Sequence, residues 1–217
     1  MQHTGANARQ ATPASRDAVD RDNNHHCRYH IVNAVLRTAE VNSFYMRVLG
    51  IDCGGAYTGY GVVEMQSHGH LYCLTSGAIV LSPREALPRR LARIFTQLGE
   101  IIALHDPDEV AIEDVFYALN VKSALKLGQV RGVAMLAAAA AGLEVAEYSP
   151  LTIKSSVVGY GRAEKQQVQH MVTRLLKLAQ PPEPLDASDA LAIAICHLHT
   201  SGTLNRQRSA KLAVRSL

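Results

Sequence analysis

Four acidic residues stand where one regular segment of the chain gives way to another, and these residues are the best placed to do chemistry. Asp52 ends an apolar run before a glycine-rich turn, and Glu113 ends a second, shorter apolar run. Asp186 and Asp189 are three residues apart at the expected start of the last helix, so they share a face. The three aspartates also have ordinary explanations, because Asp caps turns and acids in a first helical turn complement the helix dipole.

Four carboxylates gathered at one edge of a sheet repel one another unless a cation neutralises them. Carboxylate oxygens are hard ligands and favour Mg²⁺ or Mn²⁺. Two such ions about 4 Å apart can activate a water and stabilise the leaving oxygen of a phosphodiester. If the strands that end at Asp52 and Glu113 are neighbours, the sequence therefore predicts metal-dependent phosphoryl chemistry, with a nuclease as its leading form.

The elements that must position these acids follow a clear order along the chain. Three expected strands, at 47–52, 58–65 and 71–81, are joined by short turns and predict an antiparallel meander. Two more, at 109–113 and 145–148, alternate with helical segments. This order predicts an α/β domain with a mixed five-stranded sheet flanked by helices.

The first helix is expected to begin at the segment 82–85, where Ser82 and Glu85 have the spacing of a capping box, and to end at about His105. Four further helices are expected, at about 121–141, from Ser149 and Pro150 onward, at about 164–178, and from Leu185 or Asp186 to about His199.

Composition limits the classes of protein that this chain can belong to. The 217 residues are 47% hydrophobic and 19% charged, an ordinary globular balance, and no run approaches the roughly 18 apolar residues of a membrane span. The first 40 residues are polar and show no secretory signal. The four cysteines, without paired spacing, favour a reducing cytoplasmic setting; they are Cys27, Cys53, Cys73 and Cys196.

Charge and patterning predict three parts. Residues 1–45 are polar with little periodicity and are expected to be a mostly disordered extension, with Met46 as a candidate natural start. The extension contains a His and Cys cluster that fits no four-ligand pattern, so a solvated segment is favoured over a metal site. The domain at 46–200 carries 13 basic and 15 acidic residues, whereas the tail at 201–217 has four basic residues and no acid.

The chain from Met46 to about Thr200 resembles the RuvC family of Holliday-junction resolvases, whose fold is RNase H-like. The resemblance covers about 155 residues in unbroken order. It is carried by Leu-Gly-Ile-Asp at 49–52, Thr-Gly-Tyr-Gly at 58–61, Ala-Ile-Glu at 111–113, Ser-Ala-Leu-Lys-Leu-Gly-Gln at 123–129 and Asp-Ala-Ser-Asp-Ala-Leu-Ala at 186–192.

The resemblance implies a function and a site. Asp52, Glu113, Asp186 and Asp189 would be the catalytic metal ligands, holding two Mg²⁺ ions per active site, with Mn²⁺ as a substitute. A homodimer would make paired symmetric nicks in a four-way DNA junction during recombination and repair, leaving 5′-phosphate and 3′-hydroxyl ends. Its partner would be the RuvA–RuvB branch-migration complex.

The resemblance also implies residues that bind DNA. Lys154 and Lys165 would hold the phosphate backbone, and Phe116 would stack on unpaired bases at the crossover. The ordinary alternative for the lysines is that they are solvated on helix surfaces, and the neighbouring Tyr117 is expected to pack in the core. Lys126 and Arg131 lie on a helix that the family uses near its dimer interface, and only surface or interface roles are expected for them.

Three departures from the family pattern bear on DNA affinity more than on catalysis. Cys53 replaces a usual Pro and brings a thiol next to the first acid, the loop at 55–57 lacks an expected basic residue, and Leu119 replaces a usual Lys. The basic tail could compensate by attracting phosphates, or it could serve only solubility; its charges are Arg206, Arg208, Lys211 and Arg215.

Three other readings remain to be separated by experiment. An actin-like ATPase or sugar kinase has a similar first phosphate loop but needs two large lobes, and about 170 folded residues are too few. A non-catalytic nucleic-acid-binding relative would have lost acids that are intact here. A general nuclease of the same fold would cut other structured or single-stranded DNA, and comparing junction with linear substrates distinguishes it.

Overall fold

In this computed structural model the chain divides into two units, 1–43 and 44–217, and the described residues, 45–114 and 121–215, lie in the second. The side chains of Lys122 and of residues 203–215 are not described. Phe116, Leu119 and the His and Cys cluster of the extension also lie outside the described residues.

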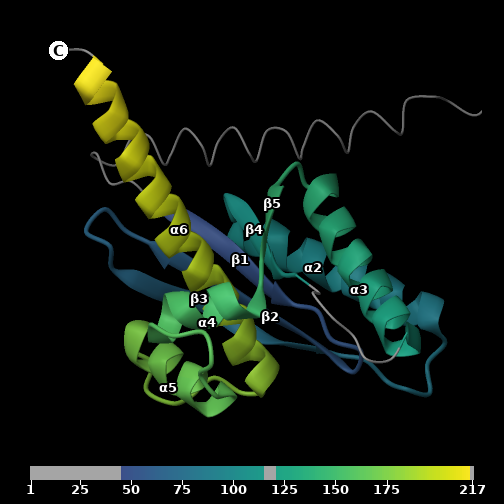
Figure 1. The fold of residues 1–217 in the computed structure, drawn as a ribbon. Coiled ribbons are helices and arrows are strands. Elements are labelled where there is room, and N and C mark those ends of the chain that lie inside the picture. The colour runs from purple at the N-terminus through teal and green to yellow at the C-terminus, as the bar shows by residue number, and fades with distance from the viewer. Residues whose placement is uncertain (1–44, 115–120, 216–217) are drawn as a thin grey trace, which may run out of the picture. The chain divides into compact units, whose positions relative to one another are not determined.

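Five strands form one sheet in the order β3-β2-β1-β4-β5 (Figure 1). The first three are antiparallel neighbours, and β4 and β5 run parallel to β1. The predicted mixed five-stranded sheet is therefore confirmed. The strands are β1 (Met46–Asp52), β2 (Tyr57–Met65), β3 (Leu71–Val80), β4 (Glu109–Glu113) and β5 (Glu144–Tyr148).

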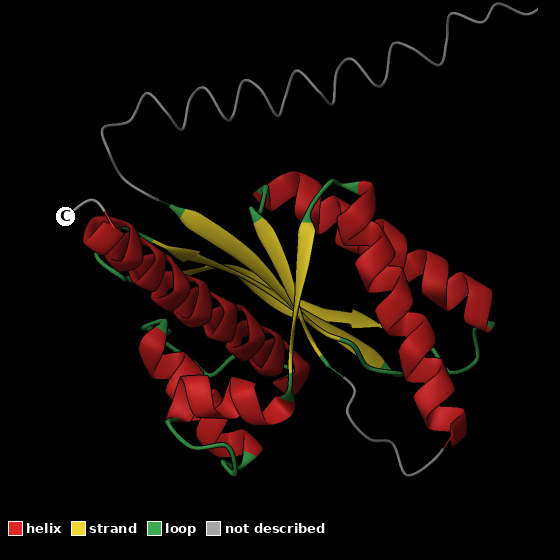
Figure 2. Ribbon diagram, turned by 45° about the horizontal axis from the view of Figure 1, so that its top comes forward, coloured by secondary structure: helices red, strands yellow, loops and turns green. Residues whose placement is uncertain are grey.

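Helices cover both faces of the sheet, so that the domain has three layers (Figure 2). Buried side chains of α2 and α3 pack on one face, and those of α4, α5 and α6 pack on the other. These helices are α2 (Leu87–His105), α3 (Val121–Ala140), α4 (Pro150–Val158), α5 (Lys165–Leu175) and α6 (Leu185–Arg215). No helix within the described ranges is both long and apolar enough to cross a membrane.

The central strand β1 is buried on both faces, and this explains why its sequence is mostly apolar. Val48 faces the α4–α6 layer, while Leu49 and Ile51 face the α2–α3 layer, and all three are fully buried. A strand covered on both faces has no solvent side on which polar residues could alternate. Asp52 ends the strand, where its side chain is only partly buried.

Glycines let the start of α6 lie directly on the sheet. A Cβ atom on Gly50 would lie 2.0 Å from the carbonyl oxygen of Ala190, and one on Gly59 would lie 2.0 Å from that of Asp186. Any side chain at these positions would push the helix away from β1 and β2. The lack of side chains at Gly50 and Gly59 therefore lets α6, which carries two of the four acids, pack close to the sheet.

The capping box expected at 82–85 is wrong, because α2 begins at Leu87 with Ala86 as its N-cap. Ser82 instead closes a turn: its hydroxyl accepts from the Arg84 amide and its carbonyl from the Glu85 amide. Pro88 gives the physical reason. In a helix begun at residue 83 it would lie in the interior, where its ring clashes and its missing N–H breaks the hydrogen-bond ladder, whereas the first turn tolerates it.

The expected end of the last helix at about His199 is also wrong, because α6 continues to Arg215. Gly202 does not stop the helix, and the residues after it are mainly good helix formers. The basic residues at 206–215 are thus part of α6 in backbone structure. The remaining expected elements agree with the structure to within a few residues.

Candidate active site

The strands bring Asp52 and Glu113 together at one edge of the sheet. β1 and β4 are parallel and in register from Val48 opposite Glu109 to Ile51 opposite Ile112. The next residue on each strand is the acid, so the two carboxylates leave the sheet side by side. The expectation that these strands are neighbours is confirmed.

The start of α6 adds the other two acids through Gly59. In β2, Gly59 pairs with Asp52, and its Cα lies against the backbone of Asp186. One residue thus touches both elements, which places the first turn of α6 over the end of β1. Asp189 follows three residues later on the same helix face.

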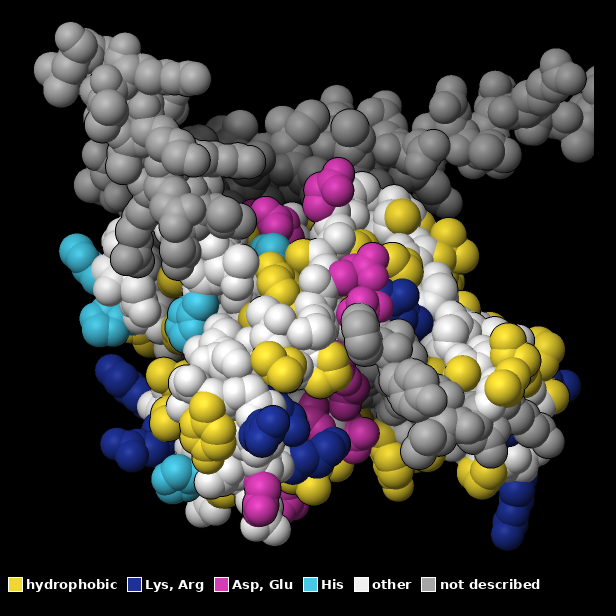
Figure 3. All heavy atoms as spheres, in the orientation of Figure 1, with side chains coloured by type: hydrophobic (Ala, Val, Ile, Leu, Met, Phe, Trp, Pro, Cys, Tyr) yellow, Lys and Arg dark blue, Asp and Glu magenta, His cyan; other side chains and the backbone are white. Residues whose placement is uncertain are grey.

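Three of the acids meet both predicted lysines in a cavity of about 220 Å³. Asp52, Glu113 and Asp189 line it together with Lys154 and Lys165, while Asp186 lies outside its lining. Figure 3 shows acidic side chains in the middle of one face with basic side chains gathered beside them. Hydrophobic residues of α4, α5 and α6 form the rest of the wall.

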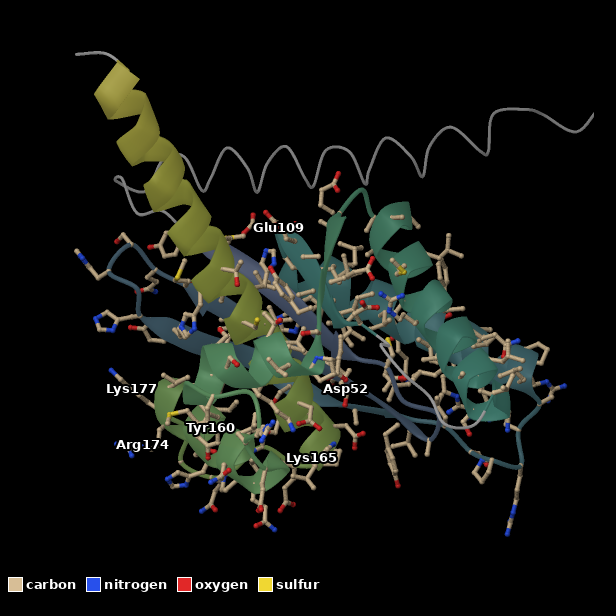
Figure 4. All side chains as sticks on the ribbon, in the orientation of Figure 1. Asp52, Glu109, Tyr160, Lys165, Arg174 and Lys177 are labelled. Atoms are coloured by element: carbon tan, nitrogen blue, oxygen red, sulfur yellow. The ribbon has the colours of Figure 1, made fainter. Side chains whose placement is uncertain are left out.

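Lys165 makes the closest charged contact in this cavity. Its ammonium donates to the Asp189 carboxylate at 2.7 Å. In Figure 4 its side chain extends from α5 toward the region of Asp52. The hydrogen bond to Asp189 raises the pKa of Lys165, so the side chain remains a cation at neutral pH.

Burial and mutual repulsion raise the pKa of two of the carboxylates in this cavity. Burial, followed by the charges of Asp189 and Glu113, raises the pKa of Asp52 to about 7. Burial and the charge of Asp189 raise the pKa of Glu113, while Lys165 and Lys154 oppose this shift. Two lysines therefore offset only part of the mutual repulsion of the acids.

A divalent cation fits this chemistry. The cavity offers carboxylate oxygens from separate elements, and the raised pKa of Asp52 shows that further positive charge would be stabilising there. Within the described ranges, no three His, Cys, Asp or Glu side chains already stand in an arrangement that would hold a metal ion. The Lys165 ammonium provides the compensating charge at Asp189 in this arrangement.

Comparison with known proteins decides the family. The family profile of crossover junction endodeoxyribonuclease RuvC matches residues 48–197. This chain belongs to the RuvC family. The resemblance expected from the sequence is confirmed, and with it the RNase H-like fold class.

Individual RuvC proteins match over nearly their whole length. The Koribacter versatilis RuvC is 63% identical over 164 residues, which cover 76% of this chain and 99% of that protein. The RuvC of Acidobacterium capsulatum is 55% identical over 170 residues. A Thermus thermophilus RuvC structure in complex with a Holliday junction substrate is 34% identical, covers 72% of this chain and 94% of that one, and superposes with a TM-score of 0.69.

Cys53, which departs from the RuvC pattern, has its side chain directed away from the carboxylate cavity. The side chain packs with the core between the sheet and the α2–α3 layer, on the opposite face from α6. Burial, with Asp52 nearby, raises the pKa of the thiol to about 12, so it is neutral. Although Cys53 adjoins Asp52 in sequence, it contributes a partly buried, neutral thiol to the α2–α3 side rather than a thiolate to the carboxylate cavity.

The loop at 55–57 lacks the basic residue that the RuvC pattern predicts, yet a basic side chain reaches it from another element. Arg90 on α2 donates to the main-chain carbonyl of Gly55. The fold therefore places a basic side chain at this loop from a helix residue that is 35 positions further along the chain.

Arg131 has a role that the sequence reasoning missed. Its Nε donates to the main-chain carbonyl of Glu113 at 3.3 Å, and its Nη2 contacts the carboxylates of Asp114, at 3.5 Å, and Glu147. Only 18% of the side chain is exposed. A usable signal existed, because Arg131 is three residues from the buried Ala134 and thus on the face of α3 that meets the sheet.

Proposed function

We propose that this protein is a Holliday-junction resolvase that makes paired, symmetric nicks in four-way DNA junctions by metal-dependent phosphodiester hydrolysis. The products would carry 5′-phosphate and 3′-hydroxyl ends, ready for ligation in recombination and repair. The observation that carries the proposal is the cavity in which carboxylates from β1, β4 and α6 meet two lysines. Family membership supports a junction as the substrate.

Each residue of the site has a proposed role. Asp52, Glu113, Asp186 and Asp189 would hold two Mg²⁺ ions, with Mn²⁺ as a substitute. The bound ions supply an activated water and stabilisation of the leaving oxygen.

Two lysines would position the substrate at this site. Lys165, once released from Asp189, would bind a phosphate at the rim of the cavity. Lys154 would neutralise a phosphate next to Glu113, whose pKa it already lowers. Phe116, beyond the described residues, keeps its proposed stacking role on the strength of the family resemblance.

A twofold homodimer would present two such sites to the near-twofold junction. Support comes from an apolar stripe on α3, where Val121, Leu125 and Leu136 are 74%, 65% and 58% exposed. Gly128 and Gly132 lie on the same stripe and have open space at their Cβ positions. A helix face of this kind is typical of a surface that a second chain covers.

Replacing Leu125 and Leu136 together by Glu is expected to convert the dimer to a monomer, because two carboxylates would be buried in an apolar contact. Sedimentation equilibrium measures the mass, and the monomer should lose paired nicking at least tenfold. Leu104→Glu on α2 is the matched control, since Leu104 is 78% exposed and lies on another helix. A variant that remains dimeric would exclude this face.

Arg131→Lys is expected to lower the cleavage rate about tenfold with little change in junction affinity. A lysine cannot reach the Glu113 carbonyl and two carboxylates at once, so the end of β4 would lose its fixed position. Single-turnover cleavage and filter binding separate rate from affinity. Lys126→Gln, an exposed cation on the same helix, is the control, and an equal loss in both variants would reject a specific role for Arg131.

Junction specificity tests the proposed function. The purified protein should nick a synthetic four-way junction in Mg²⁺, leave a linear duplex of the same sequence intact, and cut neither in EDTA. Equal cutting of both substrates would favour a general nuclease, and ATP turnover without cutting would favour an actin-like ATPase.

The cytoplasm is the proposed setting of this activity, and the RuvA–RuvB complex is its proposed partner.

A further inference from the structure

The outer surface of α5 carries charge that the active site does not use. Between residues 150 and 180 the chain has five Lys or Arg residues and a single acid, Glu164. Lys154 and Lys165 line the cavity. The exposed Arg162, Arg174 and Lys177 form no ion pair with any residue in the part of the chain that the structure describes.

This charge leads away from the acids along one helix. Lys165 begins α5 and touches Asp189, while Arg174 lies in the last turn of the same helix. Nine residues separate them, which is about 13 Å along the helix axis and about half a turn around it, so Arg174 lies on the side of α5 away from Lys165. Figure 4 shows Lys165 on the side of Asp52, and Arg174 and Lys177 pointing outward together at the other end of α5.

The backbone at Lys177 places a lysine where glycine is usually favoured. Lys177 has φ of 52°, the left-handed conformation in which glycine is favoured after a helix end. The amide of Leu178 donates to the carbonyl of Thr173, so this is the ordinary closing turn of α5. A lysine at this position gives up local stability, and among the described residues it makes no ion pair in return.

We propose that Arg174 and Lys177 bind the phosphate backbone of one DNA arm of the junction, beyond the bond that is cut. The proposal rests on the proposed function, because Lys165 marks the cleavage site at the opposite end of α5. Since phosphates on a strand advance about 3.4 Å per base pair, the contact falls about four to six nucleotides from the nick. An acidic protein could also bind such a surface, but a DNA strand held at the cavity is long enough to reach the far end of α5 as well.

The first test is the salt dependence of junction binding by the variant with Arg174→Gln and Lys177→Gln. Losing two phosphate contacts should reduce the slope of log affinity against log salt by about 1.8 and weaken binding roughly five- to tenfold near 150 mM salt. Cleavage at saturating protein should stay within about twofold of wild type. The control is Arg84→Gln with Arg89→Gln, two exposed cations on the opposite side of the sheet, which should bind as wild type.

A modified junction locates the contact. Neutral methylphosphonates at nucleotides four to six from the nick should weaken wild-type binding by a similar factor and should not weaken the double variant further. An unchanged salt slope, or equal losses in the two proteins, would overturn the proposal. If wild-type protein neither binds nor cuts junctions, the proposed function itself has failed, which is a different result.

Lys177→Gly separates binding from folding. Glycine suits the left-handed conformation, so the melting temperature should rise by about 2–4 °C while junction affinity falls roughly threefold. A loss of affinity in a more stable protein cannot come from unfolding. Wild-type affinity in this variant would reject Lys177 as a contact.

Discussion

Asp189→Asn and Asp52→Asn are each expected to abolish junction cleavage, with a loss on the order of 10³-fold or more, while junction binding persists. Asn keeps the size of the side chain but removes the charge that a divalent cation requires. The phosphate contacts come from lysines and helix surfaces that these changes leave in place. Single-turnover cleavage and fluorescence anisotropy measure the two properties on the same junction.

Glu100→Gln is the matched control for these variants, because Glu100 is an exposed acid on α2 outside the cavity lining. It should cut at the wild-type rate. Circular dichroism checks that each variant is folded. Wild-type cleavage by Asp189→Asn, or loss of binding in both site variants, would contradict the division between metal ligands and DNA contacts.

The affinity for Mg²⁺ is expected to fall by up to about tenfold for each pH unit below 7 and to level off above about 8. Burial, with Asp189 and Glu113, raises the pKa of Asp52 to about 7, and a metal ion binds only the carboxylate form. Protons and Mg²⁺ therefore compete at this residue near neutral pH. Isothermal titration of the metal-free protein between pH 5.5 and 8.5 measures the dependence.

Asp52→Asn supplies the control for this pH effect through folding stability. Because the folded pKa lies above the ordinary value of 3.8, ionised Asp52 destabilises the metal-free fold, and stability is lost as pH rises from about 4 through 7. The variant lacks this loss and should be more stable than wild type at pH 8 in EDTA, by on the order of 2–4 kcal/mol. Mg²⁺ affinity that is constant between pH 6 and 8 would contradict a titrating Asp52.

Local pattern was enough to place the acids on their elements. Asp52 and Glu113 end apolar runs that are recognisable strands, but β2, β3 and α2 separate β1 from β4 in the chain, so the pattern predicts that the two acids meet only if these strands are neighbours. Asp186 and Asp189 share a helix face however that helix packs on the sheet, because they are three residues apart. The α/β class and the helix pair of Asp186 and Asp189 therefore follow from short-range information, whereas the meeting of Asp52 and Glu113 depends on the pairing of β1 with β4.

Contacts between distant segments decided what the pattern could not. Gly59 contacts the backbone of Asp186, which is 127 residues later in the sequence. Whether Cys53 faces the cavity or the core depends on which helices cover each face of the sheet. Arg131 contacts Glu113 at the end of β4 and Glu147 on β5, which are distant from it in sequence. The misplaced start of α2 is different in kind, since Pro88 was present in the sequence and outweighed the capping pattern.

Mapping the nicks on a junction labelled in each of its four strands tests the central claim most directly. The account predicts Mg²⁺-dependent cuts at symmetric positions in two strands of like polarity, and products that DNA ligase seals without further processing. Asp189→Asn should leave all four strands intact. Cuts at unrelated positions, or ends that ligase cannot seal, would contradict a resolvase built on these four carboxylates.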